Sequence, residues 1–158
     1  MNFTSQHWIT QLQLEKHPEG GHYRRIYQSQ HLLRHNQLER PISTGIYYLL
    51  QAGEFSAFHK LDADERWFYH AGGELIIHMI DNEGAYRQQY LSATKGVLQA
   101  TVPEGVWFAA ELVNPEEYVL ASCMVSPGFL FETFELARVE VLQKLCPQQA
   151  ELINRLCV

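Results

Sequence analysis

The chain has 158 residues, of which 46% are hydrophobic and 19% are charged, and its formal net charge is −6. This composition is typical of one globular domain, and the acidic balance excludes a nucleic-acid partner, which would need a basic face. The longest apolar runs, IYYLL (46–50) and VWFAA (106–110), are far shorter than the roughly 20 residues that cross a membrane. We therefore expect one domain over residues 1–158, with neither a nucleic-acid nor a membrane partner.

The N-terminal segment and the cysteines favour a cytoplasmic protein. MNFTSQHWITQ lacks the charged region and the apolar region of a signal peptide. Cys123, Cys146 and Cys157 are odd in number and do not have the spacing of a disulfide framework. We expect them to be reduced thiols.

The first part of the chain predicts one helix, one turn and many strands. Trp8, Ile9 and Leu12 have helical spacing, so we expect a short helix over residues 5–12 with Ser5 as its N-cap. HPEGG (17–21) has the residues of a turn. Short β-rich segments then follow at regular intervals, at residues 22–29, 43–50, 54–61, 65–71, 74–80, 85–91, 96–102, 106–112 and 117–125.

The spacing of these strands indicates the fold class. Strands separated by 8–12 residues and by turn signals are typical of a β-sandwich or β-barrel. From residue 137 the apolar residues change to helical spacing, and Pro147 divides this segment into two short helices. We expect these helices to cover the outer face of the barrel or to form part of a dimer contact.

The segment from Gly53 to Gly72 has the spacing of a metal-site motif with one ligand missing. His59, Glu65 and the two glycines match the first cupin motif, G-x5-H-x-H-x3,4-E-x6-G, but Leu61 replaces the second histidine. About forty residues later Gly96, Pro103 and Gly105 resemble the second cupin motif. Phe108 stands there in place of its histidine, and Leu112 in place of its asparagine.

A closer resemblance covers nearly the whole chain. The chain resembles the cupin subfamily called "cupin 5", a domain of unknown function, in HPEGG (17–21), TGIYYLL (44–50), the block from His59 to Trp67, VPEGVW (102–107) and SPGFLFETFELA (126–137). The resemblance implies an all-β cupin double-stranded β-helix (jelly-roll) barrel, with a short N-terminal helix and C-terminal helices here. It also implies a homodimer with a pocket open at one end.

The substituted ligands argue against a metal cofactor. A catalytic metal site needs about three protein ligands, and a complete cupin set is three histidines and a glutamate. His59 and Glu65 remain, whereas Leu61 and Phe108 are apolar. We predict no cofactor, and a metal-dependent oxygenase-type cupin is our third hypothesis.

Proton chemistry is the preferred hypothesis. A histidine and a glutamate held close together in an apolar pocket can act as a base and its orienting partner. We assign the catalytic roles to His59 as base, Glu65 as its orienting carboxylate and Tyr69 as acid, because residues 65, 67 and 69 share one face of a strand. The deoxysugar epimerases, which are metal-free cupins, use a histidine base and a tyrosine acid. The hypothesis is a metal-independent isomerase or epimerase acting on a carbohydrate-like or nucleotide-sugar substrate.

The alternative is a small-ligand-binding or sensing module without catalysis. An apolar cavity with a few convergent polar groups is a normal small-molecule site. Under both hypotheses we expect the ligand-binding residues to be His17, Glu19, Tyr23, Tyr47, Phe55, Trp67 and Phe108. The aromatic residues among these, and Phe58, would otherwise be barrel core, and His17 and Glu19 would otherwise serve only a turn.

Overall fold

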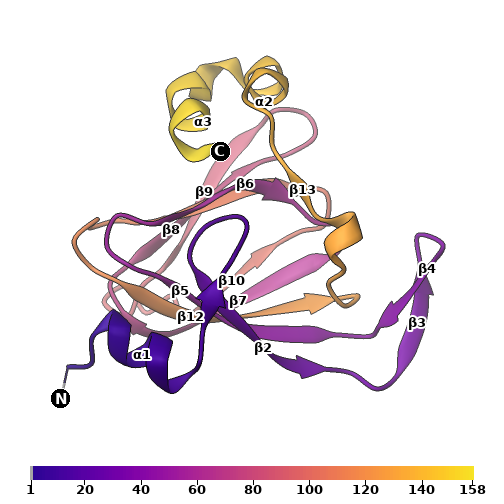
Figure 1. The fold of residues 1–158 in the computed structure, drawn as a ribbon. Coiled ribbons are helices and arrows are strands. Elements are labelled where there is room, and N and C mark those ends of the chain that lie inside the picture. The colour runs from indigo at the N-terminus through magenta and orange to yellow at the C-terminus, as the bar shows by residue number, and fades with distance from the viewer. Residues whose placement is uncertain (1) are drawn as a thin grey trace.

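The computed structural model describes residues 2–158, which form two antiparallel β-sheets facing each other (Figure 1). The six-stranded sheet contains, in spatial order, β1 (Glu15–Lys16), β2 (His22–Gln28), β5 (Thr44–Leu50), β12 (Val119–Ser126), β7 (Asp64–Gly72) and β10 (Gln99–Val102). The five-stranded sheet contains β13 (Glu135–Leu136), β6 (Phe55–Lys60), β11 (Trp107–Leu112), β8 (Leu75–Ile80) and β9 (Tyr86–Leu91). The nine predicted strands are confirmed, although β10 and β12 begin two or three residues later than expected.

Four short strands were not predicted. β1 and β13 have two residues each, which is too short to produce an alternating pattern. β3 (Leu32–His35) and β4 (Leu38–Pro41) form a hairpin that projects from the barrel (Figure 1). Its two-residue turn places Asn36 and Gln37 at positive φ, and Gln37 stands where a glycine would have made the turn recognisable.

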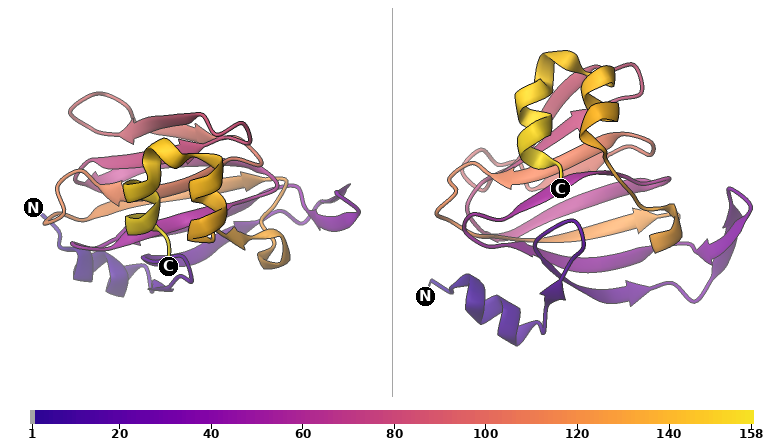
Figure 2. Two further views of the ribbon diagram at one scale, coloured as in Figure 1. Left: turned by 90° about the horizontal axis from the view of Figure 1, so that it is seen from above. Right: turned by 45° about the horizontal axis from the view of Figure 1, so that its top comes forward.

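The N-terminal helix α1 (Ser5–Gln11) covers one outer surface of the six-stranded sheet (Figure 2). Its N-cap is Thr4, one residue earlier than expected, because the Thr4 hydroxyl accepts a hydrogen bond from the His7 amide. Trp8 packs towards Leu49 and Leu120 of the sheet, and its indole N–H donates to the Tyr118 hydroxyl. The helix is therefore held by an apolar contact and one polar contact.

The C-terminal helices cover the outer face of the five-stranded sheet (Figure 2), which confirms the first of the two predicted positions. They are α2 (Val139–Leu145) and α3 (Ala150–Leu156), separated by a short 3-10 helix, η2 (Pro147–Gln149). Leu142, Ile153 and Leu156 are buried against Phe58 and Trp107 of the sheet. None of the helices in residues 2–158 is long and apolar enough to span a membrane.

The main core lies between the two sheets. Large buried side chains such as Trp67, Phe108 and Met79 fill it. At one end of this core the packing changes from apolar side chains to a cluster of ionisable ones, which form the candidate site.

Candidate active site

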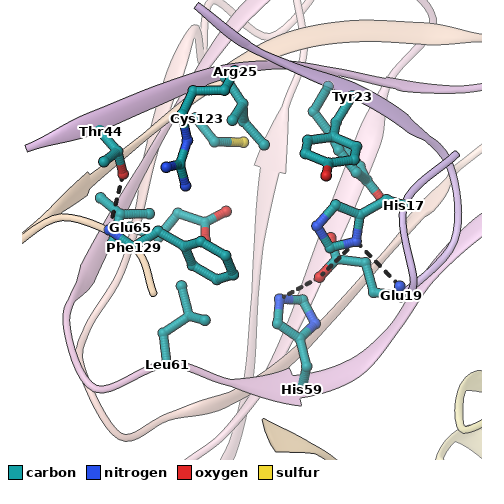
Figure 3. A pocket seen from close by; sticks show the side chains of 13 residues that line it. His17, Glu19, Tyr23, Arg25, Thr44, His59, Leu61, Glu65, Cys123 and Phe129 are labelled. Carbon is teal, nitrogen blue, oxygen red and sulfur yellow. Dashed lines mark hydrogen bonds and ion pairs between the residues drawn. The ribbon is translucent and has the colours of Figure 1, made fainter. Parts of the chain in front are cut away.

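A cavity of about 30 Å³ lies at this end of the barrel (Figure 3). This is room for about two water molecules. Strands of both sheets and the HPEGG loop supply its lining, which consists of His17, Glu19, Tyr23, Arg25, Thr44, Ile46, Tyr48, His59, Leu61, Glu65, Cys123, Val125 and Phe129. The cavity therefore brings together five of the predicted site residues, namely His17, Glu19, Tyr23, His59 and Glu65.

The HPEGG loop is packed down against the barrel. Gly20 has φ +108°, and a Cβ at this position would collide with the carbonyl oxygen of Phe55, so only glycine allows this close approach. The Tyr48 hydroxyl donates to the Gly20 carbonyl at 2.6 Å, and the Ala57 amide donates to the Glu19 carbonyl at 2.8 Å. These contacts direct the Glu19 side chain into the cavity.

An irregularity in β6 places His59 in the same cavity. His59 pairs with Phe108 and Ser56 pairs with Ala110, so β6 has one residue more than β11 over this stretch. Such a bulge reverses the alternation of side chains. As a result Phe58 packs under the C-terminal helices, whereas His59 faces the interior and is 2% exposed. Leu61 also lines the cavity, as its spacing from His59 predicted.

His59 forms an ion pair with Glu19. Its Nε2 lies 2.9 Å from Glu19 Oε2, and its Nδ1 lies 2.7 Å from the carbonyl oxygen of Ala57. Burial by itself lowers the pKa of His59, but the charge and hydrogen bond of Glu19 outweigh it and raise the pKa above the ordinary value. Since both ring nitrogens face acceptors, the geometry favours the imidazolium form.

The predicted partner of His59 was wrong. We expected Glu65 to orient the imidazole, whereas Glu19 makes the contact. Glu19 reaches His59 from a loop forty residues earlier, and the spacing within one motif cannot reveal such a long-range contact.

Glu65 lies in the same cavity but, unlike Glu19, its carboxyl is not paired with a positive charge in the described part of the chain. It is 7% exposed, and no ion pair to it is formed within residues 2–158. Burial raises its pKa to about 7, the negative charge of Glu19 adds to this shift, and the positive charge of His59 opposes it. Glu65 therefore changes its protonation state near neutral pH.

His17 and Cys123 are two further ionisable residues of the lining. His17 Nδ1 accepts a hydrogen bond from the Glu19 amide at 3.1 Å, and burial lowers the pKa of this imidazole. Burial raises the pKa of the Cys123 thiol well above its ordinary value, and the charge of Glu65 adds to this shift. Both groups are consequently neutral near pH 7.

The aromatic residues predicted to bind a ligand are mostly elsewhere. Trp67 and Phe108 are buried in the core between the sheets; the Phe108 ring lies 4.0 Å from that of His59, centroid to centroid. Phe55 packs against the cluster under the C-terminal helices, and Tyr47 packs on the outer surface beneath α1. Of the predicted aromatic contacts only Tyr23 lines the cavity.

Tyr69 is also outside the cavity. It lies on the same strand face as Glu65, as expected, but four residues along the strand correspond to about 13 Å. Its hydroxyl donates to the Gly72 carbonyl at 2.6 Å. The structure therefore does not bring Tyr69 to the cavity, because the strand alternation gave its face but not its distance.

Seven lining residues were not predicted from the sequence: Arg25, Thr44, Ile46, Tyr48, Cys123, Val125 and Phe129. Arg25 follows Tyr23 by two residues on β2, so strand alternation could have revealed it. The Phe129 amide donates to Thr44 Oγ1 at 2.9 Å, which holds the segment after β12 across the cavity. No local sequence signal indicates that contact.

The geometry does not fit a metal centre. Within residues 2–158 no group of three His, Cys, Asp or Glu side chains is arranged to hold a metal ion. Leu61 lines the cavity beside His59 without offering a ligand atom, and Phe108 contacts the imidazole ring. The Nε2 atom of His59 is already engaged by Glu19.

Two facing antiparallel sheets with His59 and Glu65 in a pocket at one end define a cupin-type barrel. The family model described as "Cupin superfamily (DUF985)" matches residues 6–137, and the chain belongs to this family. The predicted resemblance to cupin 5 is thereby confirmed, together with the jelly-roll fold class and its N-terminal and C-terminal helices.

Solved structures extend this result. A hypothetical protein from Leishmania major is 34% identical with a TM-score of 0.91, over 98% of this chain and 99% of that one. A protein from Shewanella oneidensis is 37% identical with a TM-score of 0.91, over 99% of both chains. Oxalate decarboxylase from Bacillus subtilis is 15% identical with a TM-score of 0.56, over 89% of this chain and 36% of that one, which shows the fold alone. A search of curated proteins gave no match.

Proposed function

We propose that the protein binds a small molecule in the cavity and catalyses proton transfer on it, as a metal-independent isomerase or epimerase. One observation supports this most strongly: the buried carboxyl of Glu65, with a pKa of about 7, lies in the same cavity as the His59–Glu19 ion pair. A group that exchanges a proton near the working pH is suited to general acid–base catalysis. Pairs of groups with pKa values moved in this way are concentrated at functional sites.

The proposed roles differ from those that the motif suggested. Glu65 is the base, because its carboxyl takes and returns a proton near neutral pH. His59 has both ring nitrogens engaged, so it supplies a fixed positive charge beside Glu65. Tyr23, which lines the cavity, replaces Tyr69 as the candidate acid.

The size of the cavity limits the substrate. Room for about two water molecules does not hold a sugar ring or a nucleotide sugar. In the proposed complex only the reacting end of a carbohydrate-like molecule enters, and the remainder stays outside. Removing a proton from the carbon next to a carbonyl group, with the electron pair taken up as an enolate, would then take place between Glu65 and Tyr23.

Solvent exchange tests this proposal. A thermal-shift screen of sugars, hydroxy acids and nucleotide sugars identifies ligands, and NMR in deuterated buffer then follows deuterium incorporation into each one. We expect incorporation with the intact protein and none with Glu65→Gln. Glu111→Gln is the matched control, because Glu111 lies outside the cavity, and it should exchange normally. Equal exchange by Glu65→Gln would contradict the proposed role of Glu65.

A binding or sensing module is the second candidate. The observation that favours it is that His59 is already satisfied by Glu19 and the Ala57 carbonyl, as a purely structural ion pair would be. A ligand that stabilises the intact protein but never exchanges a proton between pH 6 and 8 would establish this second function.

We also propose that the chain acts as one domain in the cytoplasm and forms a homodimer. The free thiols of Cys123, Cys146 and Cys157 support a reducing compartment. β1 pairs with only His22 and Tyr23 of β2 and leaves the rest of this edge uncovered, next to exposed Ile26, Tyr27 and Leu32. An uncovered edge with apolar residues suits pairing with a second chain. Light scattering coupled to size exclusion should give twice the mass of the chain.

A further inference from the structure

A groove on the protein surface lies next to the cavity. A groove of about 260 Å³ is lined by Glu15, Tyr23, Arg25, Phe129, Leu130 and Phe131; we call it the outer groove. It shares Tyr23, Arg25 and Phe129 with the cavity. These three side chains therefore form the boundary between the buried cavity and the surface, and a ligand that entered the cavity would pass them.

Arg25 forms no ion pair within residues 2–158, although the Glu15 carboxylate also lines the outer groove. The arginines that form ion pairs within residues 2–158 are Arg40, with Asp62, and Arg155, with Glu111. Arg25 donates only to the neutral amide oxygen of Gln28 at 3.2 Å, and its Cζ lies 6.0 Å from the centre of the Phe129 ring. Its guanidinium has donors left for an anionic oxygen.

The shape and charge of the cavity also favour an anionic oxygen at Arg25. Figure 3 shows Arg25 and Tyr23 across the cavity from His59 and Leu61, with the Arg25 side chain directed inward. The Glu19 carboxylate on the far wall is already paired with His59, so its charge is offset. The room for about two water molecules suits a flat carboxylate of three heavy atoms better than the larger phosphate.

We propose that Arg25 and Tyr23 form the binding site for the carboxylate of a small hydroxy or keto acid, whose uncharged remainder lies in the outer groove. This inference rests on the proposed function, since it names the substrate class of the same cavity. Planar guanidinium donors match the geometry of a carboxylate, and bonds of this kind are stronger than neutral ones. The carboxylate would hold the neighbouring carbon of the acid towards Glu65.

Matched probes test the site directly. Glycolate and its neutral amide, glycolamide, have nearly the same size, and their binding is measured by NMR titration of backbone amides at low ionic strength. We expect the intact protein to bind glycolate at least fivefold more tightly than glycolamide. Arg25→Gln should weaken glycolate binding about tenfold and leave glycolamide unchanged.

Arg24→Gln is the control variant. Arg24 is the preceding residue on β2, faces the other side of the sheet and donates to Leu12 and Gln13. It should bind glycolate as the intact protein does. Equal loss in the two variants, or equal binding of glycolate and glycolamide, would overturn the inference, and tighter binding of inorganic phosphate than of glycolate would overturn the choice of carboxylate.

The experiments can support or contradict the carboxylate site independently of the proposed isomerase function. Binding of glycolate through Arg25, without proton exchange on any ligand, would support the inference and contradict the isomerase. Proton exchange on an uncharged ligand that Arg25→Gln leaves intact would support the isomerase and contradict the inference.

Discussion

Two histidine–glutamate pairs, one buried and one partly exposed, occupy opposite faces of the five-stranded sheet. On the inner face His59 Nε2 lies 2.9 Å from Glu19, and on the outer face His78 Nε2 lies 2.9 Å from Glu111. The two pairs have the same composition and the same distance. Their surroundings differ, and this difference separates a candidate catalytic site from a contact that holds the fold together.

The outer pair is fully compensated. Arg155 of α3 makes two hydrogen bonds to the Glu111 carboxylate, and the Tyr86 hydroxyl lies 2.8 Å from His78 Nδ1. Burial opposes ionisation of Glu111, but the hydrogen bonds of His78 and Arg155 outweigh it and lower the pKa to about 2. This pair therefore fastens α3 to the sheet, and the Glu111 carboxylate stays ionised at ordinary pH.

The inner pair leaves one carboxyl uncompensated. Two buried carboxylates, Glu19 and Glu65, share one imidazolium, and the pKa of Glu65 rises to about 7. The comparison shows that the net charge around a pair and its access to a cavity, rather than the pair itself, identify the candidate site.

The largest loss of stability should come from Glu19→Gln, which removes the carboxylate in contact with His59 and leaves only the more distant Glu65 to offset the imidazolium charge. Loss of one partner of a buried ion pair costs about 3 kcal/mol. The raised pKa of His59 stabilises the fold below the ordinary value of 6.5, and the lowered pKa of Glu19 does so above 4.5. The loss should therefore be greatest near pH 5.5. Urea unfolding between pH 4 and 8 measures it, and a loss that is the same at every pH would contradict this account.

Glu65→Gln should have the opposite effect on stability, because it should make the fold more stable at high pH. The folded-state pKa of about 7 lies above the ordinary 4.5, so the stability of the intact protein falls as pH rises from 4.5 to 7. The neutral amide removes this dependence, and at pH 8 the variant should be more stable than the intact protein by up to about 3 kcal/mol. Near pH 4.5 the two proteins should unfold at nearly the same urea concentration. A variant that is less stable than the intact protein at pH 8 would show that ionised Glu65 stabilises the fold.

Leu61→His should add a third side chain that can ligate zinc beside His59 and Glu65, provided that the ion displaces the proton and the Glu19 contact from His59 Nε2. Three protein ligands are the usual minimum for catalytic zinc, so we expect zinc binding at least tenfold tighter than that of the intact protein, which corresponds to about 1.4 kcal/mol. Ile76→His is the control on the outer face, where Ile76 is paired with Glu111 and Arg155 already neutralises that carboxylate. Calorimetric titration should show no increase in zinc affinity for this control. An equal increase for both variants would contradict the distinction between the inner and the outer pair.

The smallest loss of stability should come from Glu111→Gln. The Glu111 carboxylate is partly exposed, so its contribution is discounted for solvent and should be about 1 kcal/mol at pH 7. The lowered pKa means that this stability is present above 4.5 and disappears as pH falls towards 2. Hydrogen exchange should become faster in α3 and stay unchanged around His59. A uniform increase across both sheets would contradict the local role of this pair.

The sequence predicted the fold better than the site. Nine strands, the N-terminal helix and the division at Pro147 followed from local periodicity, which packing then preserved. Strand alternation also placed His59 and Leu61 in one cavity. The β3–β4 hairpin escaped prediction because Gln37 occupies its turn without a glycine.

The site depends on contacts that local patterns do not contain. Glu19 reaches His59 across forty residues, and Phe129 is held over the cavity by Thr44 from β5. The bulge in β6, which turns Phe58 outward and His59 inward, has no signal in the sequence either. The sequence indicated Glu19 and Glu65 separately as site residues. Only the structure shows that both carboxylates lie near the one imidazolium of His59.

The protonation of Glu65 tests the central claim most directly. With 13C in the side-chain carboxyl groups of glutamate, NMR from pH 3 to 9 follows each carboxyl separately, and Glu65→Gln and Glu111→Gln identify the two signals. The account predicts a Glu65 signal that titrates near pH 7, while that of Glu111 is still ionised at pH 4. A Glu65 signal that titrates at or below pH 4.5 would contradict it.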